Sequence, residues 1–102
     1  MIDDGLRPIV TEFIAEMLND PCCESILLDV GEDAMVDSDL AALYLDVTGK
    51  HHEYILSIVG DEYSGRIRYA TGKTRTIVEG GEGAWKLQEL LDEIKTKLWE
   101  DK

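Results

Sequence analysis

The sequence predicts one α+β domain: an N-terminal helix, an antiparallel sheet of about five strands in meander order, and a C-terminal helix. Apolar residues recur at helical spacing near both ends of the chain and alternate with polar residues between them. No helical stretch separates the alternating segments. A parallel sheet needs such helices as crossovers, so we expect an antiparallel sheet with both helices on one face.

Length and composition fit a single domain over residues 1–102. This is an ordinary size for one compact domain, and 44% hydrophobic residues supply its core. No apolar run approaches the roughly 20 residues that cross a bilayer, and the N-terminus lacks the positive region of a secretory signal. Cys22 and Cys23 are adjacent and cannot join distant segments by a disulfide. We therefore expect a cytoplasmic protein without membrane contact.

The first helix is predicted from about Arg7 to Leu18. Pro8 suits its first turn, where the missing N–H costs nothing. The apolar residues at helical spacing are Leu6, Ile9, Val10, Phe13, Ile14, Met17 and Leu18. Asn19-Asp20-Pro21 ends the helix, because proline cannot continue the hydrogen-bond ladder.

Three strands are predicted next, over Ser25–Val30, Leu40–Val47 and about His52–Val59, and the last two pair as a hairpin through Thr48-Gly49-Lys50. Their alternation separates a core face from a solvent face. The residues expected to face the core are Ile26, Leu28, Val30, Ala41, Leu43, Leu45 and Val47. Those expected to face outward are Asp29, Tyr44 and Asp46.

A second hairpin is predicted from Arg66–Thr71 and Thr74–Glu79. Gly72-Lys73 closes it, because glycine in the first central position is what a type II′ turn needs. This register pairs Ile67 with Val78, Tyr69 with Thr76 and Arg66 with Glu79. It places Arg66, Arg68 and Arg75 together on the solvent face.

The last helix is predicted from about Ala84 to Trp99, after a flexible joint at Gly80-Gly81-Glu82-Gly83. Its buried stripe consists of Leu87, Leu91, Ile94 and Leu98, with Leu90 at the edge. Trp85 and Trp99 fall outside this stripe. Tryptophan is enriched at binding hot spots, so both residues are candidates for an apolar anchor or a seam between two copies.

The chain is strongly acidic, with 22 Asp and Glu against 10 Lys and Arg and a net charge of −12. Residues 1–65 hold 15 of the acids and two of the bases, whereas residues 66–80 hold four bases and one acid. Such a field disfavours direct binding to nucleic-acid phosphates and favours a basic partner. Solubility alone is the alternative explanation of the acidity.

The densest negative segment supplies the predicted capture site. Its members are Asp29, Glu32, Asp33, Asp37 and Asp39. They lie on a predicted strand end and loop, where side chains can point outward. Together with Trp85 and Trp99 they predict a non-enzymatic interaction module, such as an inhibitor, an immunity protein or a nucleic-acid mimic, that binds a basic protein partner. A homodimer is a further expectation.

The basic hairpin over residues 66–75 supports an alternative. Arg66, Arg68 and Arg75 would hold an anionic group there, making the protein a small ligand-binding regulatory domain. The same hairpin would also fit the acidic segment of a second copy. A third interpretation is pairing within the chain, with Glu79 and nearby acids.

Metal and catalytic sites are not expected. The acidic segment lacks the spacing of a calcium loop, and the adjacent pairs Cys22-Cys23 and His51-His52 are poorly spaced for zinc. Asp20 and Glu24 flank the cysteines and should raise their pKa, which disfavours a reactive thiolate. No nucleotide-binding or hydrolase motif occurs. We therefore expect neither an enzyme nor a cofactor.

Overall fold

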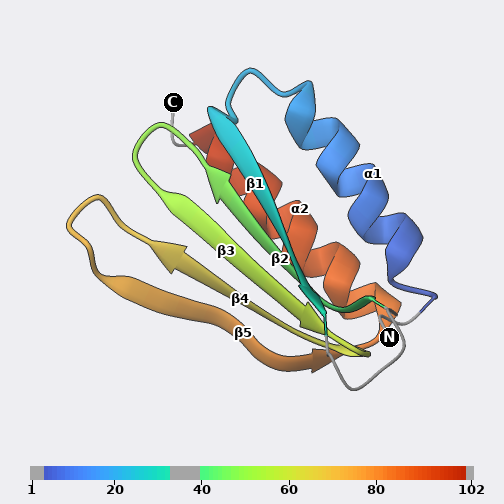
Figure 1. Cartoon of the computed structure of the whole chain (residues 1–102). Coiled ribbons are helices and arrows are strands. Elements are labelled where there is room, and N and C mark those ends of the chain that lie inside the picture. The colour runs from blue at the N-terminus through green and yellow to red at the C-terminus, as the bar shows by residue number, and fades with distance from the viewer. Residues whose placement is uncertain (1–3, 33–39, 101–102) are drawn as a thin grey trace.

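The computed structural model describes residues 4–32 and 40–100, with side chains described for residues 4–29 and 42–100. The elements are α1 (Arg7–Leu18), β1 (Ser25–Glu32), β2 (Leu40–Thr48), β3 (Glu53–Val59), β4 (Glu62–Arg68), β5 (Thr74–Glu82) and α2 (Ala84–Glu100). The strands form one antiparallel sheet in the order β1-β2-β3-β4-β5. Both helices cover one face of it (Figure 1). The predicted α+β meander is confirmed.

The core lies between the helices and the covered face of the sheet. α1 and the residue before it contribute Leu6, Val10, Phe13 and Met17, and α2 contributes Leu87, Leu90, Leu91, Ile94 and Leu98. These residues repeat at helical spacing, so each helix presents one apolar stripe to the sheet. Leu90, expected at the edge of its stripe, is fully buried.

No helix of the described residues covers the other face of the sheet, which we call the open face. In Figure 1 the strands pass in front of α2, so the viewer looks onto this face. In β2, Leu43, Leu45 and Val47 are buried against the helices, whereas Tyr44 is exposed. This agrees with the predicted alternation. The side chains of Val30 and Ala41 lie outside the described residues.

One predicted core residue of β1 remains half exposed. Leu28 lies opposite Leu45 of β2 and therefore points to the covered side, yet 54% of it is accessible, against 1% for Leu45. β1 is an edge strand with a neighbour on one side only, which leaves its side chains more exposed. Ile26 on the same strand is partly buried against the core.

The β4–β5 hairpin differs from its prediction in turn and register. Tyr69 N–H donates to Lys73 O at 2.8 Å, Gly72 N–H donates to Tyr69 O at 2.9 Å, and Gly72 has a φ of 90°. This is a three-residue loop with glycine in its last position, not a two-residue turn with glycine first. Ile67 consequently pairs with Arg75 and Arg66 with Thr76.

The glycines predicted to form a flexible joint instead belong largely to β5. Gly81 pairs with Tyr63 of β4, whose hydroxyl donates to Gly83 O at 2.8 Å. A Cβ on Gly81 would lie 2.5 Å from Cε2 of the Tyr63 ring. The prediction of a joint is wrong because the glycine makes room for this buried ring.

Candidate interaction sites

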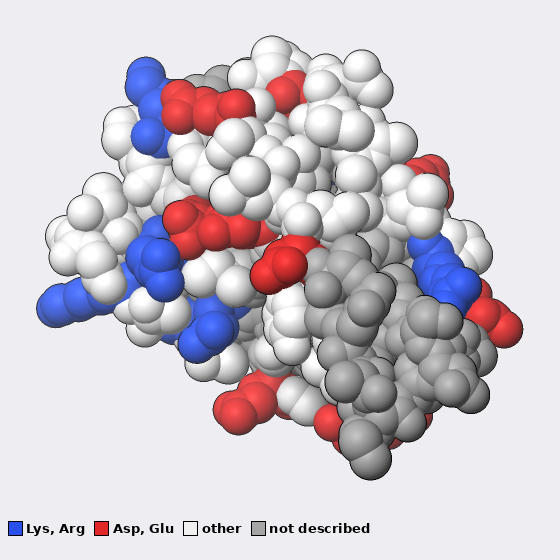
Figure 2. Space-filling view, viewed as in Figure 1, with Lys and Arg blue, Asp and Glu red and all other residues white. Residues whose placement is uncertain are grey.

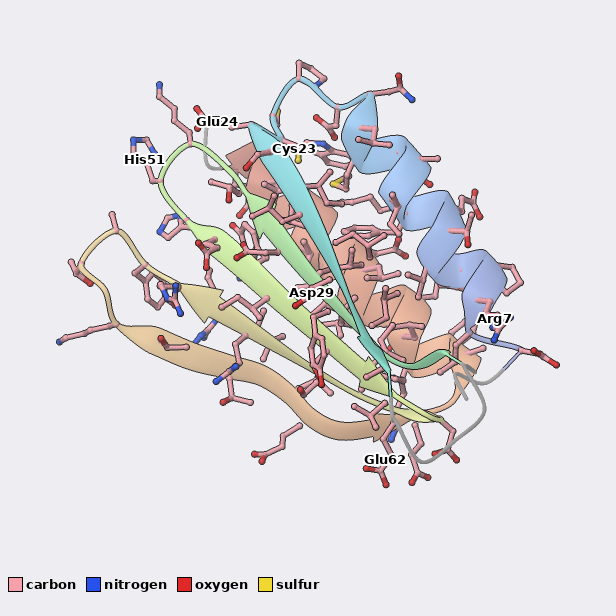
Figure 3. The ribbon with its side chains drawn as sticks, in the orientation of Figure 1. Arg7, Cys23, Glu24, Asp29, His51 and Glu62 are labelled. Atoms are coloured by element: carbon pink, nitrogen blue, oxygen red, sulfur yellow. The ribbon has the colours of Figure 1, made fainter. Side chains whose placement is uncertain are left out.

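The predicted acidic capture site is only partly described by the structure. Asp29 is exposed on the open face of β1, opposite Tyr44 of β2 (Figure 3). Glu32 ends β1, and its side chain is outside the described part of the chain. Asp33, Asp37 and Asp39 also lie outside the described residues. The arrangement of these acids therefore stays a prediction.

The two tryptophans lie near opposite ends of α2 and in different surroundings. Trp85 is 78% exposed in the first turn of the helix. Trp99 is 49% exposed, and its indole N–H donates to Asp20 Oδ2 at 2.7 Å. The structure thus joins Trp99 to an acidic residue, but to one that follows α1 and was not among the predicted site residues.

Trp99 lines an open groove between the C-terminal ends of α1 and α2, which we call the helix-end groove. Its lining residues are Glu12, Ala15, Glu16, Asn19, Asp20, Pro21, Cys22 and Trp99. Four of them, Glu12, Ala15, Glu16 and Asn19, lie at positions i, i+3, i+4 and i+7 along α1 and its C-cap. Residues with this spacing share one side of a helix. After the helix, Asp20 Oδ1 accepts a hydrogen bond from Cys22 N–H at 2.8 Å, which turns the chain at Pro21.

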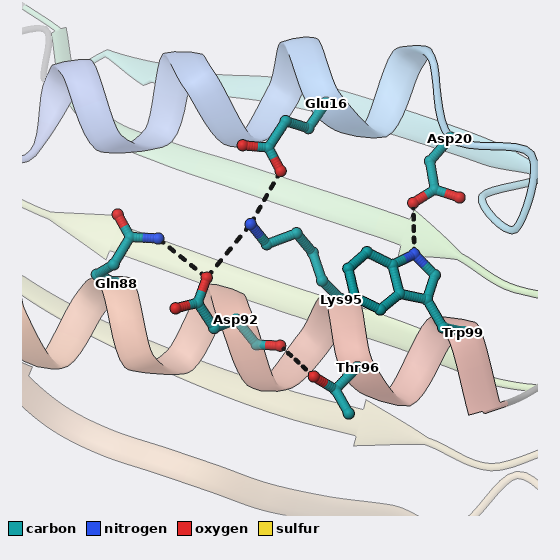
Figure 4. A network of polar contacts seen from close by, with 7 residues as sticks. All are labelled: Glu16, Asp20, Gln88, Asp92, Lys95, Thr96 and Trp99. Atoms are coloured by element: carbon teal, nitrogen blue, oxygen red, sulfur yellow. Dashed lines mark hydrogen bonds and ion pairs between the residues drawn. The ribbon is translucent and has the colours of Figure 1, made fainter.

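A polar network holds the two helices together beside this groove (Figure 4). Lys95 Nζ donates to Glu16 Oε2 at 2.9 Å and lies 3.2 Å from Asp92 Oδ1. Gln88 also donates to Asp92 Oδ1. Partial burial opposes the charge of Lys95, but its bonds to Glu16 and Asp92 outweigh this effect and raise its pKa. Lys95 therefore stays charged and keeps Glu16 in place.

The helix-end groove is acidic. Three carboxylates line it, from Glu12, Glu16 and Asp20, of which Glu16 is paired with Lys95 beside the groove. Sequence reasoning missed these acids, since Asn19-Asp20-Pro21 was interpreted only as the end of a helix. The four-residue spacing of Glu12 and Glu16 indicates that both lie on one side of α1. Nothing in the local sequence indicates the contact of Asp20 with Trp99.

The surroundings of Cys23 disfavour its thiolate form. Partial burial, and then the negative charge of Asp20, raise the pKa of the Cys23 thiol, as the sequence suggested for Asp20. Both cysteines are free thiols. Among the described residues, no three His, Cys, Asp or Glu side chains are grouped to hold a metal ion.

The three arginines of the basic hairpin do not meet on one face. Arg66 and Arg68 pair with Ile55 and Glu53 of β3 and point to the open face. Arg75 pairs with the buried Ile67 and therefore points to the helix side. Arg68 also donates to Glu53 Oε1 at 3.0 Å, so this arginine is paired within the chain with Glu53 of β3 rather than with Glu79, which the sequence suggested.

The Asp46 carboxylate lies next to this ion pair, in surroundings that disfavour its charged form. Asp46 Oδ1 is buried and has no hydrogen-bond partner among the described residues. Partial burial raises the pKa of Asp46, and the charge of Glu53 and a hydrogen bond with it raise it further, against the opposing charge of Arg68. The sequence placed Asp46 on the outward face, but its proximity to Glu53 depends on the register between β2 and β3.

The fold and its grooves thus define a small α+β domain with one helix-covered and one open sheet face. No family model, curated protein or solved structure matches this chain. Within the described part of the chain, no helix is long and apolar enough to span a bilayer. The function of the protein is therefore inferred from the geometry of its sites.

Proposed function

We propose that this protein is a non-enzymatic interaction module that binds a basic segment of a partner protein in the helix-end groove. The observation that carries this proposal is Trp99, a half-exposed aromatic side chain held by Asp20 in a groove with three carboxylates. Such a module would inhibit a partner whose working surface is that basic segment.

Trp99 suits a cationic side chain in two ways. The face of an indole ring attracts an ammonium or guanidinium group, with about 0.5–1 kcal/mol at exposed sites. The hydrogen bond to Asp20 fixes the ring, so little conformational entropy is lost when a ligand packs on it. Ala15 and Pro21 offer apolar contact to the methylene groups of a lysine or arginine, whose charged end then reaches the carboxylates.

The charge of the whole chain supports the same partner. A net charge of −12 steers basic molecules toward the protein from beyond contact distance. Long-range attraction is not specific for one site, however, and it weakens with salt over a screening length of about 8 Å at physiological ionic strength. A test must therefore separate the groove from the general field.

The test is a titration with an oligoarginine peptide at physiological ionic strength. Replacing Glu12→Gln together with Asp20→Asn should weaken binding at least about tenfold, because both acids line the groove. The matched control, Asp61→Asn with Glu82→Gln, removes the same charge from exposed positions outside the groove and should change the affinity less than about twofold. Equal weakening by both pairs would contradict the groove.

Intrinsic fluorescence gives a second readout, since Trp85 and Trp99 are the two tryptophans of the chain. The peptide should change the emission of the wild-type protein and of the Trp85→Phe variant. It should leave the emission of Trp99→Phe nearly unchanged, because the remaining indole lies at the other end of α2. The reverse pattern would place the ligand at Trp85 and overturn the proposed site.

A further inference from the structure

The two edges of the sheet differ in their protection against pairing with another chain. The edge strands are β1 and β5 (Figure 1). Proteins protect such edges with bulges, charged residues or proline. The pairing of β5 with β4 shifts register twice, and its first residues, Thr74, Arg75 and Thr76, are polar and exposed. In contrast, Ser25–Val30 of β1 pairs with β2 without a shift and contains one charged residue, Asp29, and no proline.

The odd-numbered residues of β1 direct their backbone groups away from β2. Glu24 N–H donates to the last residue of β2 at 2.8 Å, so the even-numbered positions that follow it point to β2 as well. The N–H and C=O groups of Ser25, Leu27 and Asp29 therefore point outward. In agreement, the Ser25 carbonyl accepts a bond from the Cys23 thiol, at 3.3 Å, and not from β2. Among the described strands, β2 is the only one that pairs with β1.

Apolar side chains lie on both sides of this edge. Leu27 points to the open face and is 65% exposed, and Leu28 points to the covered side and is 54% exposed. Ile26, also on the covered side, is only partly buried. Figure 2 shows mostly uncharged side chains around the first half of β1, whereas Lys and Arg side chains lie over β4 and β5. A strand added beside β1 would therefore bury apolar surface on both sides of the sheet.

We infer that β1 pairs antiparallel with β1 of a second copy of this chain, so that the two sheets become one. The segment selects a copy of itself because its polar and apolar residues are arranged symmetrically about Leu27. Pairing Leu27 with Leu27 of the second copy sets Ser25 opposite Asp29. On the covered side it sets Ile26 opposite Leu28. Each of the three pairs with outward backbone groups then exchanges two hydrogen bonds.

This register does not bring like charges into contact. Asp29 lies opposite the Ser25 hydroxyl of the second copy, and the two Asp29 side chains are four residues apart along the strands, at about 13 Å. The two Asp46 side chains, each one strand further in, are about 14 Å apart. Both separations exceed the screening length of about 8 Å. Glu24 belongs to the covered side by its even position. What remains is a general repulsion between two chains of net charge −12.

The helices leave room for the second copy. A Cβ on Gly65 of β4 would lie 3.0 Å from the Leu90 side chain, so α2 lies over β4. Packed helices are about 8–10 Å apart, which equals about two strand spacings and places α1 over β2. Between the two copies, the α1 helices are then about three spacings apart, at about 14 Å, and do not overlap. Leu28 lies in the space between them.

The contact is short, so the dimer is expected to be weak. Five residues at about 3.3 Å each give an edge of about 17 Å, and the area that it buries falls below the roughly 1,200 Å² of stable interfaces. We expect a dissociation constant between about 10 µM and 1 mM. Because the two copies repel each other, raising the salt from about 50 to about 500 mM should strengthen the dimer at least about threefold. Binding of oligoarginine should instead weaken with salt.

The experiment is a concentration series by nuclear magnetic resonance, from about 20 µM to about 1 mM. Translational diffusion measures the dimer, and the amide resonances locate it. The amides of Leu27 and Asp29, which point outward, should shift with concentration more than that of Ile26, which donates to β2. Diffusion that stays constant over this range, or shifts confined to residues outside β1, would overturn the inference.

Charge exchange at Leu27 tests the register. Leu27→Lys and Leu27→Glu should each raise the dissociation constant at least about tenfold, because like charges then lie directly opposite each other. An equimolar mixture of the two variants should restore the dimer, since lysine then faces glutamate. Leu27→Lys also lowers the net negative charge, so general repulsion alone predicts a stronger dimer for this variant. A mixture that stays monomeric would contradict the inferred pairing.

Matched controls are Val59→Lys and Val59→Glu, at an exposed apolar position of β3 away from the edge. They should leave the dissociation constant within about twofold of wild type. Effects as strong as those of the Leu27 variants would overturn the inference, and circular dichroism shows that each variant is folded. Leu27→Lys should bind oligoarginine as wild type does, because the helix-end groove lies between α1 and α2. Failure of the dimer therefore leaves the proposed function standing, and the reverse also holds.

Discussion

Leu56 and Ile55 are neighbours in β3 but lie in different surroundings. Leu56 points toward the helices and is 1% exposed. Ile55 points to the open face, where it pairs with Asp46 on one side and Arg66 on the other, and it remains partly exposed. The covered face is apolar along the whole of β3, whereas the open face mixes apolar residues with unlike charges.

This difference indicates that the two faces of the sheet contribute differently to the stability of the protein. Residues of the covered face must fill a fixed space, so their size and shape are constrained. Most described residues of the open face are at least partly exposed to water, so substitutions there should disturb the fold less. Stability should therefore depend mainly on the covered face, and the following experiments test that difference.

The largest effect is expected from shortening a leucine of the covered face. Leu56→Ala should lower the free energy of unfolding by about 2–5 kcal/mol, because it leaves a cavity under α2. Leu27→Ala on the open face should change it by less than about 0.5 kcal/mol. Urea unfolding measures both. Similar losses would mean that the open face is structural.

The next effect concerns Gly81, where the covered side meets the end of β5. Gly81→Ala should destabilise the protein by about 1–3 kcal/mol, since the new methyl group overlaps the Tyr63 ring. The same substitution should cost less in a Tyr63→Leu background, because the overlapping ring carbon is then absent. A double-mutant cycle by urea unfolding measures the coupling. Additive losses would show that the ring is not the cause.

A smaller effect is expected at Asp46 on the open face, and it depends on pH. Its pKa in the folded protein is raised above the ordinary value of 3.8, first by partial burial and then by Glu53. Protonated Asp46 therefore stabilises the folded protein. This stabilisation is present below pH 3.8 and is lost as the pH rises through the pKa of Asp46 in the folded state. Asp46→Asn should therefore be more stable than wild type at pH 7, by less than about 1 kcal/mol after solvent screening.

The pH profile of this variant distinguishes its cause. The advantage of Asp46→Asn should shrink toward zero near about pH 3.5, where wild-type Asp46 is largely protonated in the folded state and increasingly so in the unfolded state. Asp29→Asn, an exposed carboxylate of the same face, serves as the control for a general change in charge. An advantage that is constant from about pH 3.5 to 7, or one that Asp29→Asn shares, would rule out the titration of Asp46.

The smallest effect is expected from the ion pair on the open face. Arg68 and Glu53 are joined at 3.0 Å, with side chains 50% and 26% exposed. The coupling energy from Arg68→Ala and Glu53→Ala should be about 0.2–1 kcal/mol and should fall as salt is added. A coupling above that range, or one insensitive to salt, would show that the open face is less hydrated than its exposure implies.

The features that followed from the sequence are those with local signals. The stripes of α1 and α2 and the alternation in β2 and β3 depend on residues within one element, and the hydrophobic period records them directly. The meander order followed from the absence of helices between the strands. The end of α1 followed from Pro21, which cannot continue a helix.

The features that could not be predicted depend on contacts between elements. Glycine at Gly72 fits two turn types, and the choice between them shifts the whole register of β4 against β5. Gly81 was interpreted as flexible because its partner, the Tyr63 ring, comes from another strand. The helix-end groove needs Asp20 and Trp99, which are 79 residues apart.

That separation has a consequence for how the chain folds. Every strand of the meander pairs with its neighbour in the sequence, so each hairpin can form by closing a short loop. The hydrogen bonds that join Lys95 to Glu16 and Trp99 to Asp20 each connect residues 79 positions apart, which is most of the length of the chain. All five strands leave the ribosome before α2 does, and until then α1 alone, among the described elements, can cover the inner side of the sheet. Completion of this domain therefore awaits its last helix, and Trp99 is the natural reporter of that final step.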